Sequence, residues 1–147
     1  MKKILVINGP NLNMLGLREP EIYGRASYED LINYISTFCK DKADPHFFQS
    51  NHEGDIIDRI QAARGVYDGI ILNAGGYTHT SVAIADAISA VDVPVVEVHI
   101  SDIKKREPFR HHSFLTDVCK KTIMGHGFDG YLMAVDFLLA DNTQAEA

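Results

Sequence analysis

Short apolar runs alternate with helical segments along almost the whole of this 147-residue chain. Five runs have the length of a strand and are bounded by turn residues, at positions 2–8, 45–51, 67–73, 94–100 and 121–125. Helix signals, either apolar periodicity or an N-terminal cap, mark residues 28 to about 42, 53–65, 80–91 and 129–140. This alternation predicts an α/β fold with a parallel sheet and helices on both faces.

Right-handed crossovers leave few topologies for such a sheet, and we expect the flavodoxin-like three-layer fold with strand order 2-1-3-4-5. The length is that of one ordinary domain, so residues 1–147 are expected to form a single domain that ends in a polar tail at about 141–147. In open parallel sheets, ligands bind outside the carboxyl ends of the strands, where the strand order reverses. For this order, the site is predicted between strands 1 and 3.

Polar side chains and flexible backbone follow four of the predicted strands. They are N-G-P-N at 8–11, S-N-H-E at 50–53, N-A-G-G at 73–76 and H-I-S at 99–101. Because parallel strands end at the same edge of the sheet, these segments are expected to meet around one cleft.

The charge and the N-terminus exclude several classes of partner. The net charge is -6 with neutral histidines, whereas a general nucleic-acid surface needs clustered Lys and Arg. Residues 4–7 form an apolar run of only four, too short for a signal peptide or a membrane span. Cys39 and Cys119 are isolated, which is typical of a reduced chain. We expect a cytoplasmic protein with no nucleic-acid or membrane partner.

The sequence G-H-G-F-D-G at 125–130 matches the G-x-G-x-x-G pattern of dinucleotide-binding loops. That mechanism needs a further strand with an acid about 20 residues on, and only a helix and a polar tail follow here. These glycines are therefore predicted to form a tight strand-to-helix turn.

Four histidines suggest a metal site near the same edge: His79, His99, His111 and His112. The chain has no H-E-x-x-H motif and no cysteine pair to support one. In Glu97-Val98-His99, the strand period places the outer two side chains on one face, where a carboxylate can orient an imidazole for general acid catalysis. We expect no metal, with a metal-dependent hydrolase as an alternative.

Two loops carry groups suited to an anionic or hydroxylated ligand. Residues 73–81 join a strand to a helix N-terminus, where backbone N–H groups admit a ligand closely, and include Asn73 and His79. Residues 106–112 form a cationic loop that includes Arg110. The alternative for residues 73–81 is an ordinary helix cap, and the alternative for residues 106–112 is a solvated charged surface.

The connection at 9–24, G-P-N-L-N-M-L-G-L-R-E-P-E-I-Y-G, far exceeds the usual four to six residues, so it is either functional or disordered. A tyrosine pKa is ordinarily about 10, so a phenolate base near neutrality needs a shift of about 3 units, or about 4 kcal/mol. Desolvated guanidinium groups can supply it. We predict a lid in which Arg18 activates Tyr23. A tyrosine that only packs the loop is the alternative.

Five ordered motifs resemble those of the type II 3-dehydroquinate dehydratases. They lie at 9–24, 49–54 (Q-S-N-H-E-G), 73–83, 97–101 and 106–113, and the resemblance extends from Lys3 to about Leu139. It implies conversion of 3-dehydroquinate to 3-dehydroshikimate without metal or organic cofactor. The implied reaction is an anti elimination of water through an enolate, in the shikimate pathway of aromatic amino acid biosynthesis.

The resemblance also implies the catalytic roles. Tyr23 removes the C2 proton, and Arg18 lowers its pKa. Asn11 helps to hold an ordered water that stabilises the enolate. His99 protonates the leaving C1 hydroxyl, and Glu97 sets the orientation of His99.

Further positions resemble the family's substrate-binding residues. Asn73, His79 and Arg110 are expected to bind substrate hydroxyls, and the backbone N–H groups of Ile100 and Ser101 the carboxylate.

The assembly follows from the same resemblance. Asp86 is similar to an acid that reaches the site of a neighbouring subunit. Family members form trimers that group into dodecamers, so a homododecamer is expected.

The sequence departs from the family pattern at Asp102, where the family usually has Asn. The negative charge of Asp102 near the carboxylate site is predicted to have a modest effect on substrate binding.

A non-catalytic flavodoxin-like module that binds anions remains a second alternative function.

Overall fold

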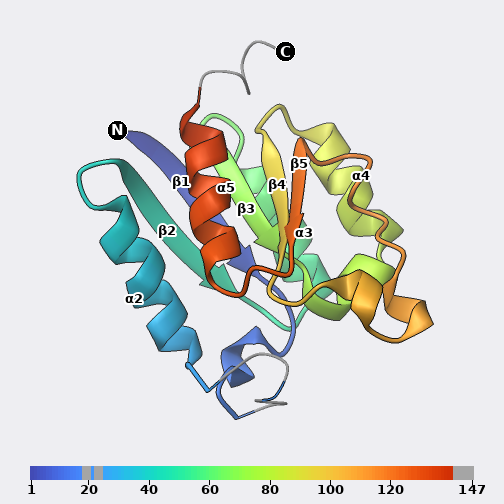
Figure 1. Ribbon diagram of the computed structural model, residues 1–147. Helices are drawn as coiled ribbons and strands as arrows, with labels where there is room; N and C mark the ends of the chain where they lie inside the picture. Colours follow the sequence, from blue (N-terminus) through green and yellow to red (C-terminus); the bar gives the residue numbers. More distant parts are fainter. Residues whose placement is uncertain (18–20, 22–24, 141–147) are drawn as a thin grey trace.

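A five-stranded parallel sheet forms the centre of the computed structural model, which describes residues 1–17, 21 and 25–140 (Figure 1). The strands are β1 (Lys2–Asn8), β2 (Ala43–Gln49), β3 (Gly69–Asn73), β4 (Val95–His99) and β5 (Lys121–Met124). Their order is β2-β1-β3-β4-β5, and every neighbouring pair is parallel. The predicted flavodoxin-like order is confirmed.

Helices cover both faces of the sheet (Figure 1). Helices α2 (Tyr28–Cys39) and α5 (Asp129–Leu139) pack on one face, and α3 (Glu53–Ala62) and α4 (Val82–Ala90) pack on the other. Within β1, Ile4 and Val6 join the first core and Leu5 and Ile7 join the second, because successive strand side chains point to opposite faces. No helix in the described part of the chain is long and apolar enough to cross a membrane.

Local chemistry sets the ends of α2. Ser27 caps its start as predicted: the Ser27 hydroxyl accepts a hydrogen bond from the Asp30 N–H, and the Asp30 carboxylate accepts one from the Ser27 N–H. The helix ends at Cys39, about three residues before the predicted end. Lys40 leaves the helical conformation at ψ 126°, and Asp41 adopts a left-handed φ of 64°, which breaks the ladder of helical hydrogen bonds.

Strand β2 begins at Ala43, two residues earlier than predicted, and includes Pro45. A proline has no N–H to donate to a sheet, so it is tolerated mainly in edge strands. β2 is an edge strand, which explains why Pro45 did not mark its start.

Short 3-10 helices follow the carboxyl ends of the strands. They are η1 (Leu12–Met14) after β1, η2 (Gly75–His79) after β3, and η3 (Ile103–Lys105) and η4 (Pro108–Arg110) after β4. Ser81 caps α4 directly after η2, because its hydroxyl accepts a hydrogen bond from the Ile84 N–H at 2.9 Å. These turns bring backbone and side chains from three strand exits together.

Replacing Gly9 by alanine is expected to destabilise the protein by about 1–3 kcal/mol, measured by urea unfolding. A Cβ at Gly9 would lie 2.5 Å from the carbonyl oxygen of Ala74 and 2.6 Å from its carbonyl carbon, which are rigid backbone atoms. The matched control is Gly54→Ala in α3, where a Cβ meets nothing within 4 Å and alanine favours the helix. Equal effects of the two substitutions would contradict this account.

Candidate active site

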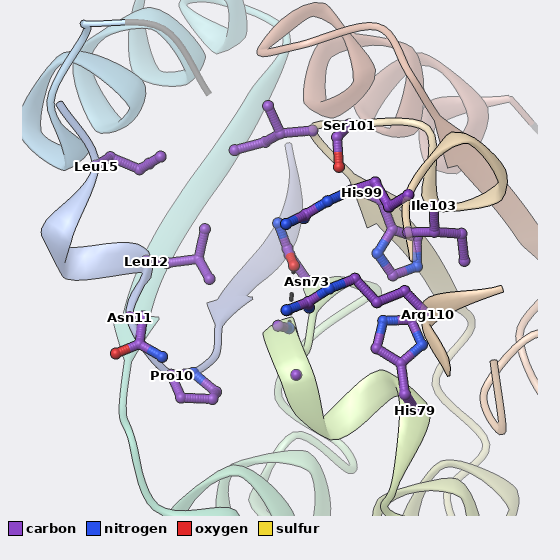
Figure 2. Close-up of a pocket in the computed structure, with 14 residues that line it drawn as sticks. Pro10, Asn11, Leu12, Leu15, Asn73, His79, His99, Ser101, Ile103 and Arg110 are labelled. Atoms are coloured by element: carbon purple, nitrogen blue, oxygen red, sulfur yellow. Dashed lines mark hydrogen bonds between the residues drawn. The ribbon is translucent and has the colours of Figure 1, made fainter. Parts of the chain in front are cut away.

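A pocket of about 160 Å³ lies at the carboxyl ends of β1, β3 and β4 (Figure 2). A cavity of about 150 Å³ suffices for benzene, so this one admits a six-membered ring. Its lining consists of Pro10, Asn11, Leu12, Leu15, Asn73, Gly75, Gly76, His79, His99, Ile100, Ser101, Ile103, Arg106 and Arg110. The predicted position between strands 1 and 3 is included in this pocket.

Most of the predicted site residues in the described part of the chain meet here. Seven line the pocket: Asn11, Asn73, His79, His99, Ile100, Ser101 and Arg110. Glu97 is fully buried and hydrogen-bonded to His99. Asp86 lies on an exposed position of α4 and does not line the pocket. Arg18 and Tyr23 lie outside the described residues.

The Glu97 carboxylate lies in a dense set of hydrogen-bond donors. Its Oε2 atom accepts from His99 Nε2 at 2.5 Å and from the Ser113 hydroxyl at 2.6 Å. Its Oε1 atom accepts from the hydroxyls of Thr116 at 2.8 Å and Thr122 at 2.9 Å. A carboxylate offers about four lone-pair sites, so the capacity of Glu97 is filled.

These contacts determine the charge of Glu97 and the tautomer of His99. Burial alone raises the pKa of Glu97, but the hydrogen bonds and the proximity of His99 outweigh it and lower the pKa to about 2. An ionised carboxylate only accepts, so Nε2 of His99 carries the hydrogen between them. The second ring nitrogen, Nδ1, is left to exchange a proton with a ligand, since His99 lines the pocket.

The hydrogen bonds of His79 select the opposite tautomer to that of His99. Its Nδ1 lies 2.8 Å from the carbonyl oxygen of His112, so Nδ1 carries a hydrogen and donates it. Burial lowers the pKa of His79, and the neutral ring keeps Nε2 as an acceptor near neutral pH. His79 can therefore accept a hydrogen bond from a ligand hydroxyl.

A buried chain of hydrogen bonds orients Asn73. Its Nδ2 donates to the hydroxyl of Tyr131 at 3.0 Å, and that hydroxyl donates to Oδ1 of Asn8 at 2.6 Å. Its Oδ1 accepts from the Gly75 N–H at 3.1 Å. Burial raises the pKa of Tyr131, so the hydroxyl stays protonated and can serve as this link. The second hydrogen on Asn73 Nδ2 is left for a ligand.

The lining is cationic although the whole chain is acidic. Arg106 and Arg110 both line the pocket, whose lining includes no Asp or Glu among the described residues. Nε of Arg110 donates to Glu107 at 3.3 Å, which fixes one edge of the guanidinium. In a chain of net charge -6, this arrangement favours a small anion.

Replacing Asp102 by asparagine is expected to change kcat/KM by less than about threefold. Asp102 does not line the pocket: its carboxylate caps η3 by accepting from the Lys104 N–H at 3.0 Å. Asparagine can accept the same bond. Steady-state kinetics tests this, and a gain above about tenfold, or 1.4 kcal/mol, would show that the charge acts on the ligand.

Several residues contact the site in ways that the sequence did not indicate. Ser113, Thr116 and Thr122 lie 16, 19 and 25 positions from Glu97, and Tyr131 comes from a helix that looks purely structural. Only the contact of Thr122 could have been anticipated, because Thr122 lies opposite Glu97 in the register of β4 and β5. Among the described residues, no group of three His, Cys, Asp or Glu side chains is arranged to hold a metal ion.

Comparison with known proteins finds similar chains within one family. The family model described as Dehydroquinase class II matches residues 2–139. A catabolic 3-dehydroquinase of Penicillium rubens is 51% identical over 146 residues, which cover 99% of this chain and 94% of that protein. A 3-dehydroquinate dehydratase of Corynebacterium efficiens is 50% identical over 99% of this chain and 97% of that protein. The crystal structure of a type II dehydroquinase from Butyrivibrio crossotus has a TM-score of 0.93 at 52% identity, covering 95% of this chain and 98% of that one.

Proposed function

The chain belongs to the class II dehydroquinases, hydro-lyases that dehydrate 3-dehydroquinate, and we propose that Tyr23 and His99 are the base and the acid of this elimination. The observation that carries the proposal is the buried pair of Glu97 and His99 beside a cationic pocket. A histidine oriented by an ionised carboxylate is suited to general acid catalysis. The positive charge of the lining suits a substrate that is an anion.

The first proposed step is removal of the C2 proton by the Tyr23 phenolate. The C–H electron pair moves into the ring, and the C3 carbonyl becomes an enolate. Arg18, five residues earlier in the same segment, lowers the pKa of Tyr23 by placing a positive charge beside the phenolate. Asn11, which lines the pocket on the side of β1, helps to hold the water that stabilises the enolate oxygen.

The second proposed step is loss of the C1 hydroxyl. The enolate reforms the carbonyl, the C1–C2 double bond forms, and the C–O bond breaks as His99 Nδ1 transfers a proton to the departing oxygen. Water leaves, and the product is a conjugated enone. Glu97 keeps the imidazole in the orientation and tautomer that this transfer needs.

The remaining lining residues are proposed to bind the substrate. Asn73, His79 and Arg110 contact its hydroxyls, in agreement with the free donor of Asn73 and the free acceptor of His79. The backbone N–H groups of Ile100 and Ser101, directly after β4, take the carboxylate.

We also propose a cytoplasmic homododecamer, a tetramer of trimers, in which Asp86 of one subunit reaches the site of its neighbour. The exposed position of Asp86 on α4 supports this. The named relatives include a 3-dehydroquinate dehydratase and a catabolic 3-dehydroquinase, and the proposed chemistry serves either use. A role in aromatic amino acid biosynthesis is our proposal for this chain.

One assay separates this mechanism from its alternatives. The protein is incubated with 3-dehydroquinate and a chelator, and the ultraviolet absorbance of the conjugated enone is followed. We expect full turnover. Absorbance that rises only without chelator would show that activity depends on a metal, as the metal-dependent alternative predicts. Ligand-dependent thermal stabilisation without any turnover would indicate a non-catalytic binding module.

A further inference from the structure

Three hydroxyl groups surround the buried Glu97 carboxylate, and we propose that they stabilise the negatively charged pair of Glu97 and His99 that is left when His99 gives its proton to the leaving group. The groups belong to Ser113, Thr116 and Thr122, which act as positioning residues. The inference rests on the proposed function, because it concerns the step in which His99 gives up its proton.

The hydrogen-bond geometry defines what these hydroxyls do. Each oxygen lies 2.6–2.9 Å from the carboxylate, and an ionised Glu97 can only accept, so all three hydrogens point at it. They come from two segments: Ser113 and Thr116 precede β5, and Thr122 lies in β5 opposite Glu97. Ser113 is fixed further because its oxygen accepts the Leu115 N–H at 3.1 Å.

Proton transfer changes the charge of the buried pair. Before it, the imidazolium of His99 and the carboxylate of Glu97 sum to zero. After it, the pair carries a net charge of -1 in a site where Glu97 is fully buried and His99 is 5% exposed. An uncompensated charge is costly at such burial. The positive ends of three hydroxyl dipoles stabilise the negative pair more than the neutral pair, so they favour release of the proton.

The other titratable groups near the pair of Glu97 and His99 keep one charge state through the pH range in which kcat is measured. Burial, and then the charge of Glu97, raises the pKa of the Cys119 thiol, which stays protonated. Burial lowers the pKa of His79, which stays neutral. Arg106 and Arg110 in the pocket lining remain cationic. Among the described residues, the alkaline loss of activity should therefore report the Glu97–His99 pair.

The test is the pH dependence of kcat for Thr122→Val, with 3-dehydroquinate as substrate. Without this hydroxyl, the pair holds its proton more tightly. We expect the alkaline limb of kcat to move to higher pH by about half a unit to one unit, and the plateau to fall about three- to tenfold. A variant with merely looser packing would lose kcat without moving the limb.

Two controls complete the test. Thr122→Ser keeps the hydroxyl and should restore the wild-type limb, whereas Thr37→Val on the exposed side of α2 should change nothing. Thr116→Val, at a more exposed position, replaces Thr122→Val if that variant does not fold. An alkaline limb that stays in place or moves to lower pH overturns the proposal. Turnover by the wild-type protein in the same assay tests the proposed function separately.

Discussion

Replacing Tyr23 by phenylalanine is expected to lower kcat roughly 10²- to 10⁴-fold, the range that a positioned general base contributes. The phenyl ring preserves shape but cannot accept the C2 proton. Binding of an enolate-like inhibitor should stay within about threefold, because the proposed ligand contacts come from the strand exits. The measurements are steady-state turnover of 3-dehydroquinate and inhibitor titration by calorimetry.

A matched control uses another tyrosine. Tyr34 lies on α2, is 44% exposed, donates to Asp129 at 2.6 Å and does not line the pocket. Tyr34→Phe should leave kcat within about twofold. If Tyr23→Phe weakened inhibitor binding as much as it lowered kcat, Tyr23 would be a packing residue of the loop rather than the base.

Glu97→Gln is the second substitution with a large expected effect, about a 10²-fold loss of kcat at pH 7. Glutamine is close in size, and its amide can donate to the oxygens of Thr116 and Thr122 while its carbonyl accepts from His99 and Ser113. The fold should persist, but the imidazolium loses its counter-charge. His99 then gives up its proton at lower pH.

The loss follows from the pH window of the reaction. In the proposed mechanism, turnover needs an ionised Tyr23 and a protonated His99 at the same time, so loss of the His99 proton at a lower pH reduces kcat on the alkaline side. The alkaline limb of kcat should move to lower pH, opposite in sign to Thr122→Val. Equal unfolding midpoints of Glu97→Gln and wild type in urea would confirm that the fold is intact. An unchanged profile would show that the carboxylate charge has no role.

The architecture follows from the sequence because two local signals agree over long stretches. β-branched runs bounded by turn residues mark β1 and β3, and the capping box of Ser27 and Asp30 marks the start of α2. Two of the boundary errors depend on one or two residues each. Lys40 and Asp41 leave the helical conformation after Cys39, and Pro45 enters a strand because that strand is at the edge.

Most of the pocket lining could be anticipated because the strand exits carry it in contiguous motifs. The supporting groups could not, since their partners are distant in sequence. Tyr131 reaches Asn8 across 123 positions and Asn73 across 58, a contact that exists only once α5 packs on the sheet. Helix periodicity marks Tyr131 as a core residue but carries no information on the partner of its hydroxyl.

The position of Pro45 also bears on how copies of this chain meet. An edge strand normally presents a row of N–H and C=O groups on which another polypeptide can add a strand, a common route to aggregation. β2 carries Phe47 and Phe48 and is only partly buried, yet Pro45 removes one donor from that row. Continuation of the sheet from one molecule into the next is thereby disfavoured. Aggregation by strand addition at this edge should therefore be slower at high protein concentration.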